Sequence, residues 1–143
     1  MNRYALAALV VLAPLAAVAS VGKVVKLEGA ATRTAADGKT EDLKVESAIE
    51  LKDKLEVKAK GALKLELTDG SVIMLDENSK LEITEAAFEG QERKGFSAFL
   101  SAGKIWTSVK KALGGAKYEI NTQRAVAGVR GTIFRIDADA LVK

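Results

Sequence analysis

The chain is poor in the side chains that carry out chemistry in proteins. Its 143 residues include no cysteine and no histidine, which excludes disulfides, thiolate and imidazole metal ligands, a cysteine nucleophile and the commonest general base. An active site built from the remaining types would need a carboxylate pair or a Ser–Lys arrangement, and no spacing in the sequence singles one out. We therefore expect a protein that is not an enzyme and that holds no cofactor.

One acidic run has the composition of a cation-binding loop. Asp76-Glu77-Asn78-Ser79 offers oxygen ligands, but it lacks the alternating acidic spacing, the glycine and the terminal glutamate of a calcium-binding EF-hand loop. We expect a turn at this point and no metal ion.

The single tryptophan, Trp106, is the strongest candidate for recognition of another molecule. Tryptophan is enriched at the hot spots of protein interfaces, but a lone tryptophan in a β module more often belongs to the core. We expect Trp106 to be a core residue, with an exposed binding role as the alternative.

The charge pattern gives no support for nucleic-acid binding. The net charge is +3 and the pI is about 9.1, yet lysine alternates with acidic residues, as in residues 51–58. Such alternation predicts solvated strand faces rather than a patch of one sign. With few aromatic residues for base stacking, we expect no nucleic-acid partner.

The first residues have the three parts of a secretory signal. Arg3 precedes an apolar stretch, Pro14 interrupts it, and Ala17-Val18-Ala19 provides the small residues of a cleavage site. We expect a signal peptide over residues 1–19, a mature domain over residues 20–143, and a periplasmic or secreted location. The alternative is an uncleaved anchor, because residues 4–21 carry no charge and fall just short of a membrane span; only then would the chain contact the membrane.

The mature sequence predicts one all-β domain of many short strands. It has no proline, and Asp37-Gly38, Asp69-Gly70 and Gly114-Gly115 are strong turn signals. Short alternating segments lie between or beyond them, at residues 81–83, 103–109, 118–122 and 132–136. We expect a roll, a β-solenoid or a sandwich.

The clearest hairpin joins residues 62–68 to residues 71–75. With Asp69-Gly70 as a two-residue turn, Leu67 would pair with Val72 and Leu65 with Met74. The second arm would then be apolar on both faces, which predicts a central strand covered on both sides.

Two segments are harder to assign. Residues 41–60 are rich in helix-forming residues, but Ile49, Leu51, Leu55 and Val57 share one parity and Lys52-Asp53 suits a reversal, so we expect strands. Residues 85–98 are expected to form an irregular, charged excursion.

In order, the motifs VKLEGAA (residues 25–31), LKDKLEV (51–57), LTDGS (67–71), GKIW (103–106) and VAGVRGTIF (126–134) resemble those of the FecR family. The most specific piece is the Val-Arg-Gly-Thr-x-Phe signature at residues 129–134. The sequence departs from the family pattern where Lys52-Asp53 replaces Gly-Asp and Thr122-Gln123 replaces Thr-Pro. The family also tends to continue beyond the signature, whereas this sequence ends at Lys143.

The resemblance implies an all-β periplasmic domain without enzyme chemistry. Proteins of this family relay the state of an outer-membrane receptor to an inner-membrane anti-sigma apparatus, and many others are stand-alone exported proteins. An envelope protein, either a receptor or an inner-membrane regulator, is the implied partner. We expect that the chain cannot itself transmit a signal across the inner membrane unless its apolar leader stays anchored.

The signature supplies the candidate site residues besides Trp106. We expect Gly128 and Gly131 to allow a bend or close approach that a Cβ would block, with Thr132 and Phe134 in the returning strand. The five donors of Arg130 would bond carbonyls inside the domain or a carboxylate of a partner, and we favour the first.

Two functions follow from these expectations. The favoured one is a binding module that engages an envelope protein through a sheet edge or through the face around Trp106 and Arg130. The alternative is a structural or cell-wall-associated protein that adheres to glycan or to copies of itself.

Overall fold

The computed structural model describes residues 20–110, 115–129 and 133–138, and it leaves the side chain of Phe134 undescribed. Within these ranges the regular structure is entirely β, which confirms the predicted fold class. The strands are β1 (Gly22–Glu28), β2 (Ala31–Thr34), β3 (Thr40–Asp42), β4 (Ala48–Ile49), β5 (Lys54–Val57), β6 (Ala62–Leu67), β7 (Val72–Leu75), β8 (Lys80–Glu89), β9 (Glu92–Ala102), β10 (Lys104–Ser108), β11 (Lys117–Asn121), β12 (Val126–Gly128) and β13 (Ile133–Asp137).

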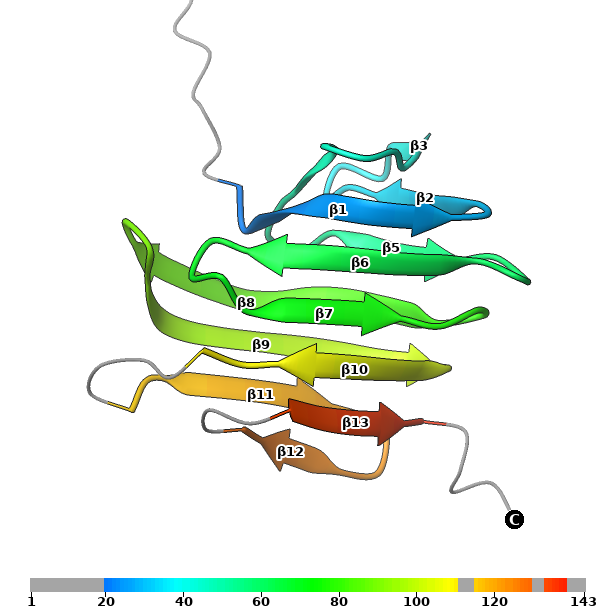
Figure 1. The fold of residues 1–143 in the computed structure, drawn as a ribbon. Coiled ribbons are helices and arrows are strands. Elements are labelled where there is room, and N and C mark those ends of the chain that lie inside the picture. Colours follow the sequence, from blue (N-terminus) through cyan, green and yellow to red (C-terminus); the bar gives the residue numbers. More distant parts are fainter. Residues whose placement is uncertain (1–19, 111–114, 130–132, 139–143) are drawn as a thin grey trace, which may run out of the picture.

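The strands form two sheets that face each other (Figure 1). The first sheet has the order β13-β10-β7-β6-β1-β4, and the second has the order β12-β11-β9-β8-β5-β2-β3. The chain passes repeatedly from one sheet to the other while advancing from the β3–β4 end to the β12–β13 end, as the colours of Figure 1 show. The result is a sandwich wound like a short solenoid.

One apolar cluster fills the space between the sheets. Every second residue of β6, β7 and β10 points inward, and β5, β8 and β9 face them with the same alternation. The largest fully buried side chains are Tyr118, Phe96, Ile49, Leu55, Leu63, Leu65, Ile73, Leu75, Leu81, Ile83, Leu100 and Ile105. The period-two pattern of the sequence therefore reports which residues form the core.

The β6–β7 hairpin is present, but its predicted register is wrong by one residue. Leu65 pairs with Ile73 and Lys64 pairs with Met74. The connection has three residues rather than two, since the Leu67 amide donates to the Ser71 carbonyl and Gly70 adopts φ 83°, as in a type I turn followed by a left-handed residue.

The corrected register changes what the β7 strand presents. Ile73 and Leu75 now share the buried face, while Met74 points to solvent and is 42% exposed. The strand is central in its sheet, as predicted, between β6 and β10. It is covered on one face and not on both.

Residues 41–60 form short strands and turns rather than a helix, as predicted. Ile49, Leu55 and Val57 are buried, but Leu51 lies in a turn and is exposed. Lys52 adopts φ 70°, a left-handed conformation that suits glycine, and this is the position where the FecR pattern has Gly-Asp. The Asp53 carboxylate accepts the Glu50 amide at 2.7 Å and closes the turn.

The expectation of an irregular excursion at residues 85–98 is wrong. These residues belong to β8 and β9, which are the longest strands among those described and form one hairpin. Phe96, Ala98 and Leu100 face the core. The charged residues of this segment lie on the solvent side or at the hairpin end, except Arg93, which is buried. The density of charge in the sequence concealed a strand that is apolar on one face only.

Polar groups inside the sandwich fix the β10 strand against the second sheet. The buried Thr107 hydroxyl donates to the Val72 carbonyl at 3.1 Å. The Tyr118 hydroxyl lies 2.5 Å from Thr107 Oγ1 and therefore acts as the donor in that contact. Burial raises the pKa of Tyr118 far above its ordinary value, so the hydroxyl stays protonated.

Several predictions fall outside the described residues. They include the signal peptide at residues 1–19 and the Gly114 half of the Gly114-Gly115 turn.

Asp76-Glu77-Asn78-Ser79 forms a turn, as predicted, with Asn78 at φ 58°. In the part of the chain that the structure describes, no helix has the length and apolar character needed to cross a membrane.

Candidate functional site

Five outward side chains line up across five strands of the first sheet. Lys26 on β1 pairs with Lys64 on β6, Lys64 with Met74 on β7, Met74 with Trp106 on β10, and Trp106 with Arg135 on β13. Directly paired residues of antiparallel strands point to the same face. Together with Ile133 on β13, these residues are called the Trp106 face.

Trp106 is 37% exposed and points away from the core, so the expectation of a core tryptophan is wrong. Its neighbours Ile105 and Thr107 occupy the inward positions of β10, and strand alternation places Trp106 outside. The Arg135 guanidinium stacks over its ring at 5.5 Å from the centroid. This cation–π contact holds the ring at the surface.

The Trp106 face gathers exposed apolar area in one place. Met74 lies beside Trp106, and Ile133 is 69% exposed one strand further. A shallow hollow of about 320 Å³ runs from Trp106 and Met74 toward Lys64, Lys26 and Glu28. Isolated exposed apolar residues need no explanation, but a group of them on one sheet face indicates an interaction surface.

The charges on the Trp106 face are unequally paired. Lys26 forms an ion pair with Glu28 at 3.4 Å. By contrast, no carboxylate within residues 20–110, 115–129 and 133–138 forms an ion pair with Lys64 or Arg135. The face therefore offers two cations to a partner, one at each side of Met74 and Trp106.

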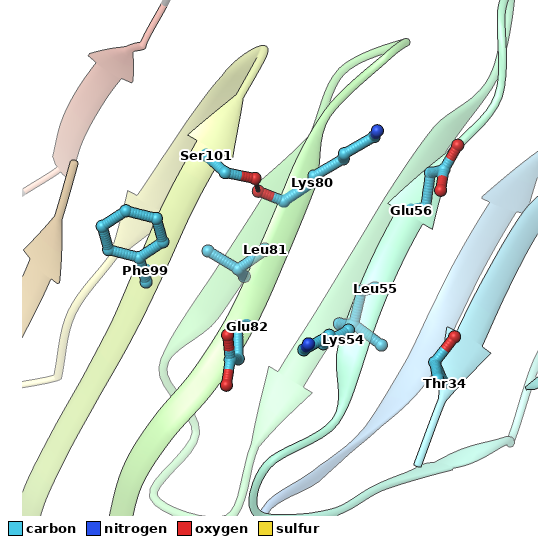
Figure 2. A pocket seen from close by; sticks show the side chains of 9 residues that line it. All are labelled: Thr34, Lys54, Leu55, Glu56, Lys80, Leu81, Glu82, Phe99 and Ser101. Carbon is cyan, nitrogen blue, oxygen red and sulfur yellow. Dashed lines mark hydrogen bonds between the residues drawn. The ribbon is translucent and has the colours of Figure 1, made fainter. Parts of the chain in front are cut away.

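A second hollow, of about 290 Å³, lies on the outer side of the second sheet (Figure 2). Phe99 on β9 pairs with Glu82 on β8, Glu82 with Lys54 on β5, and Lys54 with Thr34 on β2. Acidic and basic side chains therefore lie side by side in this hollow, and Phe99 is partly buried. It has the character of the solvated strand face that the sequence predicts, so we take the Trp106 face as the candidate site.

The signature residues are only partly described. Gly128 lies in β12, where a Cβ would meet no atom of the described residues within 4 Å. The described residues therefore show no close approach at Gly128, and a bend there stays a prediction. Val129 is buried. Arg130, Gly131 and Thr132 lie outside the described residues, and the predictions for them stay predictions. The returning strand is β13, which includes the backbone of Phe134.

Sequence reasoning missed Met74, Ile133 and Arg135. Met74 was assigned to the buried face because the hairpin register was wrong by one. Ile133 and Arg135 have the same parity along β13, two residues apart, and that parity was the available signal. Their meeting with Trp106 depends on the β10–β13 pairing, which joins residues far apart in the sequence.

The most buried charged groups are structural. Arg93 forms an ion pair with Asp69 at 2.6 Å and donates to the Lys110 carbonyl at 3.1 Å. At the other end of the sandwich, the Arg33 guanidinium lies 2.6 Å from the Asp53 carboxylate. Burial raises the pKa of Asp53, and this outweighs the opposing effects of the Glu50 amide and Arg33.

The chemistry of the described residues supports binding. No group of three or more acidic side chains among them is arranged to hold a metal ion. What the outer surface does offer is an exposed aromatic ring, adjacent apolar side chains and two cations that form no ion pair with a described carboxylate. These features are typical of surfaces that recognise another molecule by contact.

Comparison with known proteins supports the family resemblance. The FecR protein family model matches residues 53–142. A solved structure described as a cell surface anchoring domain is similar over 46% of this chain and 87% of its own, with 23% identity and a TM-score of 0.45. No curated protein sequence matches the chain. Because the family match spans more than half of the 143 residues, the chain belongs to the FecR protein family.

Proposed function

We propose that this domain is a non-enzymatic, extracytoplasmic binding module that engages a protein of the cell envelope through the Trp106 face. The observation that carries the proposal is the exposure of Trp106 beside Met74 on the outer face of a sheet. Both side chains are apolar, and their contact with water is unfavourable in the free domain. A partner that covers them removes this apolar area from water, which contributes favourably to the free energy of binding.

Family membership supports this proposal, because FecR-type domains act in regulation and signalling at the envelope. The signal-like residues 1–19 supply the route of export. The mixed charge of the remaining surface, including the hollow of Figure 2, keeps the rest of the domain solvated. The partner would be an outer-membrane receptor or an inner-membrane regulator.

The test is capture of the partner from the native envelope by cross-linking to the tagged full-length protein. Trp106→Ala is compared with Val45→Ala, which truncates another exposed apolar residue, in a turn at the opposite end of the sandwich. Circular dichroism and urea unfolding confirm that both variants are folded. We expect wild type and Val45→Ala to capture the same envelope protein and Trp106→Ala to lose it.

Other results would overturn the proposal. If Trp106→Ala captures the partner as well as wild type does, the Trp106 face is not the interface. If wild type captures only its own copies or cell-wall material, the domain is the structural or self-assembling protein of the alternative hypothesis.

A further inference from the structure

Each sheet ends in two edge strands, and one of these edges differs from the others. The edge strands are β4 and β13 in the first sheet, and β3 and β12 in the second. Three of them have only two or three residues, whereas β13 has five. Short edges are a common protection against unwanted strand pairing. The β13 strand also lacks proline and pairs with β10 without a register shift, so its edge is regular.

The hydrogen-bonding pattern shows which backbone groups β13 directs outward. The Ala138 amide donates at 2.9 Å to the carbonyl of Gly103, the residue that directly precedes β10. Because hydrogen-bonded and non-hydrogen-bonded pairs alternate along an antiparallel ladder, the Ile136 backbone bonds β10 and the Arg135 backbone points to the open side. Among the described residues, β13 pairs with β10 alone.

The side chains beside this edge have a definite chemical pattern. Arg135 and Ile133 lie on the outer face, two residues apart. Arg135 rests on Trp106 and has no ion pair with a described carboxylate, and Ile133 is largely exposed. If a further strand were added at this edge, the most favourable residue opposite Arg135 would be one with a carboxylate. The most favourable residue opposite Ile133 would be an apolar one.

We propose that the partner binds by adding an extended strand to the β13 edge, with an acidic residue opposite Arg135 and an apolar residue two positions away opposite Ile133. This inference rests on the proposed function, and it names the chemistry of the partner at the same face. Main-chain hydrogen bonds supply affinity in strand addition, and alternate side chains supply specificity. The added strand would continue the row of Met74, Trp106 and Arg135 by one position.

A second copy of the chain is a poorer occupant of this edge. In the fully overlapped antiparallel pairing of two β13 strands, Arg135 would face Arg135 of the other copy. Like charges directly opposite each other destabilise a sheet. The occupant is therefore a different protein, with an acidic extended segment.

The test uses amide hydrogen exchange and titration by NMR on the full chain with a defined probe. The probe is a capped peptide of alternating threonine and outward residues, Thr-Val-Thr-Glu-Thr-Val-Thr, and its matched control has lysine in place of glutamate. In the free protein we expect the Arg135 amide to exchange rapidly and the Ile136 amide to be protected. The glutamate peptide should slow exchange at Arg135 and bind about three- to tenfold more tightly than the lysine peptide at low salt.

Variants then separate the edge from the face. Arg135→Glu should reverse the preference between the two peptides, whereas Lys64→Glu makes the same charge change on a central strand and should leave the preference in place. Three results contradict the inference: an Arg135 amide that is already protected in the free protein, equal affinity for both peptides, or no shift up to the solubility limit of the peptide. If the envelope partner is lost in Trp106→Ala but retained in Arg135→Glu, the proposed function stands and strand addition at β13 does not.

Discussion

Gly103 sets the entry of the β10 strand, which carries Trp106, and its replacement by alanine is expected to destabilise the fold. The residue has φ 82°, a left-handed conformation that costs an alanine about 1 kcal/mol. A Cβ built on it would also lie 2.5 Å from Ser79 Cα and 2.8 Å from Ser79 Cβ. Part of this obstruction is backbone, which a side-chain rotation does not relieve, so the two segments must separate.

The cost of that separation follows from the bonds it would break. The Ser79 hydroxyl donates to the Lys104 carbonyl and accepts from the Lys104 amide, both at 3.0 Å. At about 1 kcal/mol for each bond, and with the left-handed strain added, Gly103→Ala should lower the free energy of unfolding by about 3 kcal/mol. We expect this loss as a lower urea midpoint with an unchanged slope.

Two other glycines provide matched controls with the same substitution. Gly38 also has a positive φ, 87°, but its Cβ would meet no atom within 4 Å, so Gly38→Ala should cost only the strain of about 1 kcal/mol. Gly128 has neither feature, and Gly128→Ala should change stability by less than about 0.5 kcal/mol. Effects on the unfolded chain are similar in all three variants. If Gly103→Ala costs no more than Gly38→Ala, the steric argument is refuted.

Three further predictions concern buried groups and Trp106. Because burial raises the pKa of Asp53 above its ordinary value of 3.8, the folded state holds the carboxyl proton more tightly than the unfolded state does. Wild type should therefore lose stability relative to Asp53→Asn as pH rises through the raised pKa, which urea unfolding between pH 3 and 7 measures. A gain in stability by wild type relative to Asp53→Asn over this range would mean that the pKa is lowered. Thr107→Val should cost about 1–3 kcal/mol by leaving the Tyr118 hydroxyl without its acceptor, and adding Tyr118→Phe should recover part of the loss; strict additivity of the two changes in a double-mutant cycle would count against the bond. Ile105→Ala should lower the free energy of unfolding by about 2–5 kcal/mol because the Ile105 side chain is buried. Trp106→Ala should lower it by only about 1 kcal/mol. If thermal unfolding shows equal losses for the two variants, Trp106 is part of the core.

The sequence predicted those features that depend on neighbouring residues. Period-two alternation identified the strands around Leu65 and Ile105, and Asp37-Gly38 and Asp69-Gly70 marked turns that the structure has. The same parity argument favoured strands at Ile49 and Val57 against helix propensity. The motifs at residues 126–134 were enough to indicate the FecR family, which the family match confirms.

Register and exposure were decided by the tertiary structure. A three-residue connection at Gly70 in place of a two-residue one moved Met74 from the core to the surface, because a shift of one residue exchanges the two faces of a strand. Trp106 is exposed because Ile105 and Thr107 fill the inward positions of β10. Nothing local to Trp106 specifies which parity faces the core.

The candidate site is the clearest case of this division. The sequence by itself determined an all-β chain of the FecR family that contains no cysteine or histidine, since composition and alternation are properties of the chain. Only the tertiary structure placed Lys64, Met74, Trp106 and Arg135 in one row. These residues come from four strands, and their proximity is created by non-local pairing that no short-range pattern records.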